Sequence, residues 1–376
     1  MAHKTLIGGT AYNISSGKSL VSGTSYNIKG GKTLIGGTGY SISFGSGGGG
    51  EPTAMLYSDG DMVFQHGSDV ASGKTLTASY TGFEDTVYTS QSSIPWNSKM
   101  GSIKKVSFND EIKPISISHW FYNARYMTSF NWNNFNWSNV TNMASAYYNC
   151  RNLTGSPVCG NNVTSMASAY YNCRNLTGSP VCGDNVTNMF QTYMDCQNLT
   201  GSPVCGNNVT SMLQTYYNCR NLTGSPVCGN NVISIQRTYE GCQKLTGSPV
   251  CGDNVINMYR AYYNCQNLTG SPVCGNNVTS MAYAYFNCVN LNAGTFYFYA
   301  KNISSARNCF HGKNNSRRYN IHVPANSKTL NTFIINNTYS LVGKAITWNT
   351  TTDVNGVITR YYNATYNICI FVNTSM

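Results

Sequence analysis

The sequence predicts an α/β solenoid with one short strand and one short helix in each 23-residue coil, between β-rich N-terminal repeats and a β-rich C-terminal cap. The main observation is a cysteine that recurs every 23 residues without insertion, at Cys150, Cys173, Cys196, Cys219, Cys242, Cys265 and Cys288. A unit this short cannot bury its own apolar side, so its copies must stack on one another. The other observations are a second repeat before residue 46 and strand-like runs after residue 291.

The first element, 1–45, contains three 14-residue units that begin at Lys4, Lys18 and Lys32. Alternating apolar residues, broken by Gly-Gly or Ser-Gly, predict short strands and turns in each unit. The Gly-rich run 46–51 is typical of a flexible linker, which makes 1–45 a separate part of the chain.

The next element, 52–119, is predicted to be a β subdomain that caps the solenoid. The stretch 54–67 predicts a hairpin with Asp59-Gly60 at its turn. After residue 291 the 23-residue register is lost, and the runs TFYFYA, YNIHV and ICIFV predict strands in 292–376. The terminal units of a repeat stack need such caps, so 292–376 is predicted to close the other end.

Within 120–291, constant and changing positions predict the two sides of each coil. Met143, Ala146, Tyr147 and Cys150 are spaced i, i+3, i+4 and i+7, which predicts the buried face of a short helix. The constant segment LTGSPVCG predicts a short strand, with its Pro at a position where no ladder N–H is needed.

The changing positions are predicted to form an exposed strip of aromatic, Met, Gln and Arg side chains along the stack. Exposed aromatic residues in a row often mark interaction sites, although free drift of exposed positions is the alternative explanation. The residues predicted to bind a receptor are Phe190, Tyr217, Arg237, Tyr259, Arg260, Tyr263, Tyr283 and Phe286.

The formal net charge of the chain is +11, and its most positive part is 292–376. Arg317, Arg318 and Lys328 are predicted to contact an anionic ligand, such as an anionic glycan or a teichoic-acid-like polymer. Nucleic acid is the least favoured partner for this basic segment. An ordinary solvated surface is the third interpretation.

The chain offers no recognised catalytic arrangement. The five histidines are scattered and match no nucleophile, base and acid spacing, so we expect no enzyme activity and no cofactor. The cysteines are not spaced like zinc ligands and no His recurs with them, which disfavours a zinc site. We expect reduced structural thiols; oxidation of some of them after release of the protein is the alternative. The sequence contains no window of about 20 apolar residues, so we expect no membrane-spanning helix.

The pattern Val-Thr-Ser-Met, three residues, Tyr-Tyr-Asn-Cys, two residues, Leu-Thr resembles the BspA-like, bacterial-surface leucine-rich repeats. The resemblance covers about 120–291. The stretch from Trp120 to Met143 resembles the 26-residue version, with Ala124 in the Cys position. This resemblance implies a leucine-rich-repeat solenoid with a surface for adhesion or recognition, but it does not identify the ligand.

The Lys-Thr-Leu-Ile-Gly-Gly-Thr segments of 1–45 look like those that open structural proteins of phages from gut Firmicutes. They imply a fibre- or spike-like virion protein that contacts other virion proteins through 1–45 and recognises a host cell-surface glycan or protein. The first residues have no apolar signal-peptide region, which favours assembly in the host cytoplasm and release by lysis. A secreted or surface-held bacterial adhesin, a purely structural capsid decoration or head fibre, and a homo-oligomer all stay open.

Overall fold

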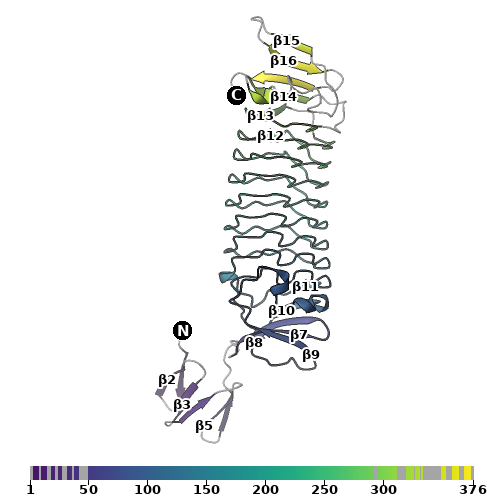
Figure 1. The fold of residues 1–376 in the computed structure, drawn as a ribbon. Coiled ribbons are helices and arrows are strands. Elements are labelled where there is room, and N and C mark those ends of the chain that lie inside the picture. Colours follow the sequence, from purple (N-terminus) through teal and green to yellow (C-terminus); the bar gives the residue numbers. More distant parts are fainter. Residues whose placement is uncertain are drawn as a thin grey trace.

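The computed structural model describes residues 50–291 without a gap. It also describes the strands between His3 and Ser41, segments 295–310, 319–325 and 327–330, residue 332, and the strands between Asn349 and Asn373. The described elements are mostly strands, and the helices among them are few and short (Figure 1). In this described part, no helix has both the length and the apolar character needed to span a membrane.

The N-terminal units form one antiparallel strand pair each. The pairs are β1 (His3–Ile7) with β2 (Thr10–Ile14), β3 (Lys18–Val21) with β4 (Thr24–Asn27), and β5 (Lys32–Ile35) with β6 (Thr38–Ser41). Each pair belongs to one 14-residue unit, so the strands predicted from the repeat are confirmed.

A five-stranded sheet in the order β11-β10-β8-β7-β9 precedes the main repeats. Its strands are β7 (Pro52–Tyr57), β8 (Asp61–His66), β9 (Leu76–Thr81), β10 (Lys105–Phe108) and β11 (Ser129–Phe130). The predicted hairpin is confirmed, because β7 and β8 pair antiparallel around Gly60, whose φ of 93° suits a residue without a Cβ. The 3₁₀ helices η1 (Gln91–Ser93) and η2 (Asn97–Ser102) lie between β9 and β10.

Aromatic side chains join this sheet to the first coil. Phe64 stacks on Trp120 with ring centroids 5.3 Å apart, and Phe83 and Trp96 contact the same indole edge to face. The Trp96 Nε1 donates a hydrogen bond to the Trp120 carbonyl at 2.6 Å. All four side chains are buried, so the sheet covers apolar surface that the first coil would otherwise expose.

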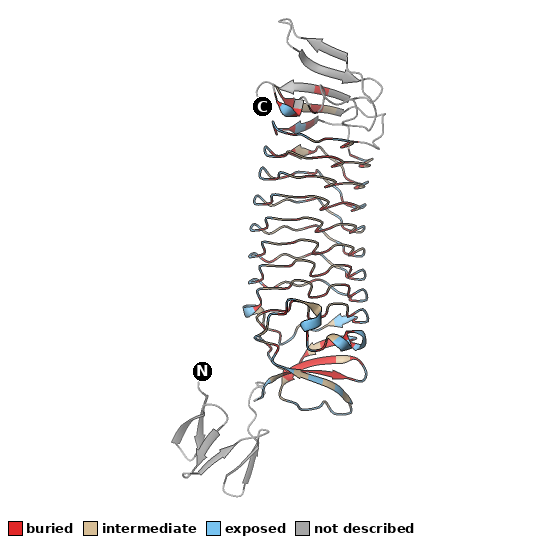
Figure 2. Ribbon diagram, in the orientation of Figure 1, coloured by how far each residue is buried: buried red, intermediate tan, exposed pale blue. Residues whose placement is uncertain are grey.

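The 23-residue repeats stack as successive coils along one axis (Figure 1). Parallel bridges join equivalent residues of neighbouring coils, from Asn142 with Ser165 through Ser165 with Asn188 to Asn257 with Ser280. Buried and exposed residues alternate around each coil (Figure 2). The constant positions are buried in every coil, as the repeat predicted; in the first they are Val140, Met143, Tyr147, Cys150 and Leu153.

Residues 143–150 and their equivalents form a run of turns, so the predicted short helix is wrong. Within the coil, Ala146, Tyr148 and Cys150 donate N–H groups to carbonyls three residues earlier, and Ser145, Tyr147 and Asn149 donate to the next coil. A helix would keep all of these bonds within its own segment and could not join the neighbouring coil. The positive φ angles of Ser145 and Asn149, 56° and 62°, also exclude a right-handed helix.

In-register stacking arranges the constant Tyr and Cys residues as ladders. Tyrosine rings from Tyr147 to Tyr285 stack nearly parallel, with neighbouring centroids 5.1–5.6 Å apart. The Cys173 Sγ–H donates to the Tyr147 carbonyl at 3.0 Å, and this bond recurs in each later coil to Cys288. The fourteen cysteines whose side chains are described are free thiols. The thiol therefore contributes a hydrogen bond between coils that an alanine could not make.

The predicted strand in LTGSPVCG is wrong for the described coils before residue 250, because a tyrosine hydroxyl takes its backbone hydrogen bonds. The Tyr216 hydroxyl donates to the Val204 carbonyl at 2.7 Å and accepts the Val204 N–H at 3.0 Å. Tyr170, Tyr193 and Tyr239 make the same pair of bonds. From Val250 onward this segment instead bridges to the next coil and leads into β12 (Val273–Cys274).

A six-stranded sheet in the order β12-β13-β14-β17-β16-β15 follows the last coil. Its further strands are β13 (Thr295–Phe298), β14 (Tyr319–Pro324), β15 (Asn349–Thr352), β16 (Ile358–Asn363) and β17 (Ile368–Asn373). The predicted strand runs TFYFYA, YNIHV and ICIFV contain β13 and most of β14 and β17, so these strands are confirmed. The short helix α1 (Lys328–Leu330) follows β14.

The tyrosine hydroxyls provide a matched test of this architecture. Tyr216→Phe leaves both backbone groups of Val204 without their partner, so we expect it to lower the free energy of unfolding by about 1–3 kcal/mol. Tyr262 is the control, because its buried hydroxyl has no hydrogen-bond partner in the described part of the structure. Tyr262→Phe should leave stability unchanged or raise it. Urea denaturation measures both, and equal losses would contradict the assigned role of the hydroxyl.

Alkaline pH should destabilise the stack. Burial raises the pKa of the Cys159 thiol from 9.0 to about 11 and of the Cys182 thiol to about 12. An unfolded chain would lose these protons near pH 9, whereas the folded chain retains them, so the stabilisation is complete below pH 9 and is lost above it. We expect the urea midpoint to be constant from pH 7 to 8 and to fall between pH 9 and 11. A midpoint that stays constant to pH 11 would contradict this.

Candidate recognition surface

The changing positions form one strip along the coils. It consists of the positions, here called slots, of Ala144, Ser145, Tyr148 and Arg151 and of their equivalents in the other coils. All eight residues predicted to bind a receptor lie in this strip. They are half-buried rather than exposed, so the prediction of exposed aromatics is wrong. The reason is the short distance between coils, which lets neighbouring rings stack and cover one another's faces.

The slot of Tyr148 contains two stacks of aromatic rings. Tyr122, Tyr148 and Tyr171 stack with centroids 4.4 Å apart and planes within 6° of parallel. Tyr263 and Phe286 stack at 4.6 Å and 3°. Offset or parallel ring contacts at these distances stabilise the pair beyond simple burial. These rings therefore stabilise the stack and present mainly their edges at its surface.

Glu240 occupies the slot of Tyr148 in the coil between Tyr217 and Tyr263. Its carboxylate accepts from the Arg237 Nε at 2.8 Å and from an Arg260 terminal nitrogen at 3.3 Å. The Glu240 side chain is only 9% exposed, and the two arginines are about 30% exposed. The hydrogen bond to Glu240 is the largest cause that raises the pKa of Arg237. One buried carboxylate thus neutralises part of the charge of two guanidinium groups.

The same two arginines lie over aromatic rings. The Arg237 guanidinium carbon is 4.9 Å from the Tyr217 ring centroid, and that of Arg260 is 4.3 Å from the Tyr263 centroid. Tyr259 and Tyr283 also lie within 6.0 Å of Arg260. At these distances the positive charge of a guanidinium group is attracted to the ring faces. The structure therefore brings Tyr217, Arg237, Arg260 and Tyr263 together around Glu240.

The slot of Ser145 has a positive φ in every coil, between 53° and 58°. Its residues are Ser145, Ser168, Gln191, Gln214, Arg237, Arg260 and Tyr283. Gly and Asn adopt this backbone region at the lowest cost, whereas other residues lose roughly 1 kcal/mol or more. The chain places neither Gly nor Asn here, so these side chains contribute something that offsets the backbone cost.

The remaining predicted site residues are less closely associated. Phe190 is half-buried, two coils before the Glu240 cluster. Phe286 contacts Tyr263 and Tyr283. Lys328 is exposed in α1, whereas Arg317 and Arg318 lie outside the described residues. The anionic-ligand site predicted from these three residues therefore stays a prediction.

Two features of the surface were not predicted from the sequence. One is the role of Glu240, although a single charged residue in an aromatic slot is a visible signal. The other is how the exposed arginines Arg151, Arg174 and Arg220 are anchored: their exposure was predicted, but not their contact with the Asn two residues earlier. Their Nε atoms donate to that Asn at 2.7–2.8 Å. The recurring Asn-Cys-Arg triplet was the available signal for this arrangement.

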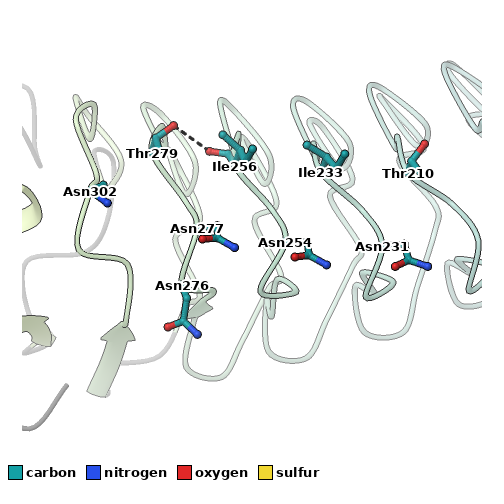
Figure 3. Close-up of a pocket in the computed structure, with 9 residues that line it drawn as sticks. All are labelled: Thr210, Asn231, Ile233, Asn254, Ile256, Asn276, Asn277, Thr279 and Asn302. Carbon is teal, nitrogen blue, oxygen red and sulfur yellow. Dashed lines mark hydrogen bonds between the residues drawn. The ribbon is translucent and has the colours of Figure 1, made fainter.

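A groove of about 600 Å³ lies on another face of the last coils (Figure 3). Its lining consists of Thr210, Asn231, Ile233, Asn254, Ile256, Asn276, Asn277, Thr279 and Asn302. Ile233 and Ile256 are 49% and 45% exposed and occupy a slot that holds Thr in the other coils. The lining contains no acidic or basic side chain, so its own residues offer no acid–base chemistry.

Among the residues whose placement is described, no three His, Cys, Asp or Glu side chains gather in a way that could hold a metal ion. Burial raises the pKa of Cys159, Cys182 and Cys228 to about 11 or 12, which keeps these three thiols protonated at neutral pH, whereas the side-chain hydrogen bond with Cys274 lowers the pKa of Cys251. A thiol with so high a pKa is a poor nucleophile at neutral pH. The strip itself offers aromatic rings, guanidinium groups and amides, which are groups that bind partners through stacking and hydrogen bonds.

No family model matches this chain, and no curated protein does. Among solved structures, the chain is similar to a leucine-rich cell surface protein from Faecalibacterium prausnitzii A2-165. The match has a TM-score of 0.30 and 14% identity, and it covers 76% of this chain and 90% of that chain. A similarity at this level supports no argument about function, so the conclusions below rest on this chain's own residues.

The ion cluster can be tested with an exposed pair as control. Glu240→Gln leaves two half-buried guanidinium groups without their carboxylate, so we expect a loss of about 1–3 kcal/mol in the free energy of unfolding. Glu111 pairs with Lys113 at 2.8 Å, but both side chains are about half exposed, so Glu111→Gln should cost less than about 1 kcal/mol. Urea denaturation compares the two. Equal effects would contradict a structural role for Glu240.

Proposed function

We propose that this protein is an adhesin-like attachment protein, in which a solenoid of BspA-like leucine-rich repeats presents the strip around Glu240 to a cell-surface partner. The observation that carries the proposal is the contrast between core positions that stay constant and a strip whose residues change along the stack, mostly after the second coil. The strip contains Arg237, Arg260 and Tyr283 at positions where the backbone favours Gly or Asn. Arg and Tyr are also the residues that dominate binding energy at protein interfaces.

The finer proposal is that the protein belongs to a virion, as a fibre or spike that recognises a host glycan or protein. Residues 1–45 would attach to other virion proteins, and the stack would carry the recognition surface. The resemblance of the three 14-residue units to the opening segments of phage structural proteins supports this assignment. The paired strands β1 to β6 agree with a small β-rich unit at this end. Immunogold labelling of purified virions should then mark the particle; label confined to bacterial envelopes would contradict the virion assignment.

The strip can be tested with substitutions that other coils already carry. The full chain with Phe190→Ala, Tyr259→Ala and Tyr283→Ser replaces three strip residues by residues found in the same slots of the first two coils. We expect at least a tenfold loss of binding to cell envelopes, because a few aromatic and arginine side chains dominate interface energy. Surface plasmon resonance on immobilised envelopes measures the loss.

The matched control changes a different face. Ile233→Thr and Ile256→Thr restore in the groove the residue that other coils have in that slot, so binding through the strip should change less than twofold. A strip variant that binds like the parent would contradict recognition by the strip. If the groove variant loses more envelope binding than the strip variant, the recognition site lies in the groove.

A further inference from the structure

Three exposed arginines at the edge of the strip are held in fixed positions by the fold. Arg151, Arg174 and Arg220 occupy the slot directly after the constant Cys. Each Nε donates to the Oδ1 atom of the asparagine two residues earlier, at 2.7, 2.7 and 2.8 Å. The three side chains and their Asn partners are hereafter called the arginine row. Because Nε is bonded, the terminal nitrogens of each guanidinium group point away from the anchor.

The anchors of the row are themselves fixed by neighbouring coils. The Asn172 Nδ2 donates to the Asn149 Oδ1 at 2.7 Å, and Asn149 donates to the Asn123 Oδ1 at 2.6 Å. Asn218 donates to Asp195 at 2.6 Å. These residues have φ angles of 58–66°, a backbone region in which Asn is favoured among residues with a side chain. The anchors are therefore part of the fold, and the guanidinium groups lose little freedom when a ligand binds.

Two arginines of the row, Arg151 and Arg174, have no partner of opposite charge among the described residues, whereas the anchor of Arg220 bonds to the carboxylate of Asp195. Arg237 and Arg260 share the carboxylate of Glu240, whereas no salt bridge within the described part of the chain involves Arg151 or Arg174. Equivalent side chains repeat every 5.1–5.6 Å along the tyrosine ladder, so these two adjacent guanidinium groups repel each other. An anion between them removes that repulsion and gains hydrogen bonds from both.

Charge is unevenly distributed between the two ends of each coil. The basic residues of 120–291 all lie on the strip or in the turn beside the row: Arg125, Arg151, Arg174, Arg220, Arg237, Lys244 and Arg260. Asp195 and Glu240 lie on the same side, and Asp184 and Asp253 lie in the other turn, at the Asn-Asn positions. The side with the row is therefore positive, and the other turn is neutral or negative.

We propose that the arginine row binds an anionic polysaccharide, whose carboxylate or phosphate groups accept hydrogen bonds from the terminal guanidinium nitrogens. Planar guanidinium groups match both kinds of anion. The stack of Tyr122, Tyr148 and Tyr171 lies next to the row and adds phenol groups suited to sugar hydroxyls. These rings cover each other's faces, which leaves no free platform for nucleic-acid bases. The inference specifies the ligand class of the proposed attachment function.

Binding of defined polymers to the full chain tests the row. The probes are polygalacturonate, a phosphodiester-bearing mannan, fully methyl-esterified polygalacturonate and poly(U) RNA. We expect the chain to bind polygalacturonate or the phosphodiester-bearing mannan, with an affinity that falls steeply as salt is added. Its affinity for the neutral methyl ester should be at least tenfold lower than for the preferred anionic polymer. The preferred polymer distinguishes carboxylate from phosphate. Absence of binding to both anionic glycans, or tighter binding to poly(U), would overturn the proposal.

Variants separate the row from general positive charge. Arg151→Gln, Arg174→Gln and Arg220→Gln together should weaken binding to the preferred polymer at least tenfold. Three exposed lysines of the N-terminal subdomain provide the matched control for net charge, as Lys99→Gln, Lys104→Gln and Lys105→Gln. This control should weaken binding less than twofold. Similar effects of the two triple variants would show unspecific charge attraction and overturn the site.

A third variant tests the geometry. Arg→Lys at the same three positions keeps the charge but removes the planar group and its bond to Asn, so we expect an intermediate loss, about three- to tenfold. Parental affinity of this variant would overturn the role assigned to the fixed guanidinium groups. A urea midpoint equal to that of the parent confirms that each variant is folded. If the parent chain binds the polymer but does not bind cell envelopes, the attachment function is contradicted, whereas the proposal that the arginine row binds an anionic polysaccharide still stands.

Discussion

The division of backbone hydrogen bonds between one coil and the next determines the register of the whole stack. Across 143–150, alternate N–H groups bond to a carbonyl three residues earlier or to the coil ahead. The positive φ angles at Ser145 and Asn149 make this alternation possible, because they turn successive N–H groups in opposite directions. A shift of one residue would break both sets of bonds at once. Equivalent residues consequently stay in line from coil to coil.

Strict register gives each sequence difference a consequence for its neighbours. Inside the stack it produces the tyrosine ladder and the thiol bonds between coils. On the surface it places Glu240 between Tyr217 and Tyr263, where it interrupts the aromatic stack and brings Arg237 and Arg260 together. A single substitution thus changes the chemistry of three coils. Variation along the strip is therefore constrained by contacts on both sides, which weakens free drift as its explanation.

The 23-residue period predicted the buried residues but not the conformation that buries them. Met143, Ala146, Tyr147 and Cys150 face inward in a run of turns just as they would in a helix, so the pattern could not separate the two. The slot of Asn149 did contain a signal for positive φ, since it holds only Asn, Asp or Gly. The strand near Val204 was mispredicted because a tyrosine of the following coil supplies its hydrogen bonds, and alternation of apolar residues cannot show such a contact.

For the surface, the sequence predicted which positions vary but not which charges are already compensated. Arg237 and Arg151 are equally visible as basic residues, yet only the structure shows that Arg237 shares the Glu240 carboxylate while Arg151 is held by a neutral amide. A guanidinium group paired with a buried carboxylate loses hydrogen bonds if it turns to a ligand. One held through Nε keeps its anchor and still offers its terminal nitrogens. The uncompensated arginines are therefore better placed to bind an anion than the more aromatic cluster that the sequence singled out.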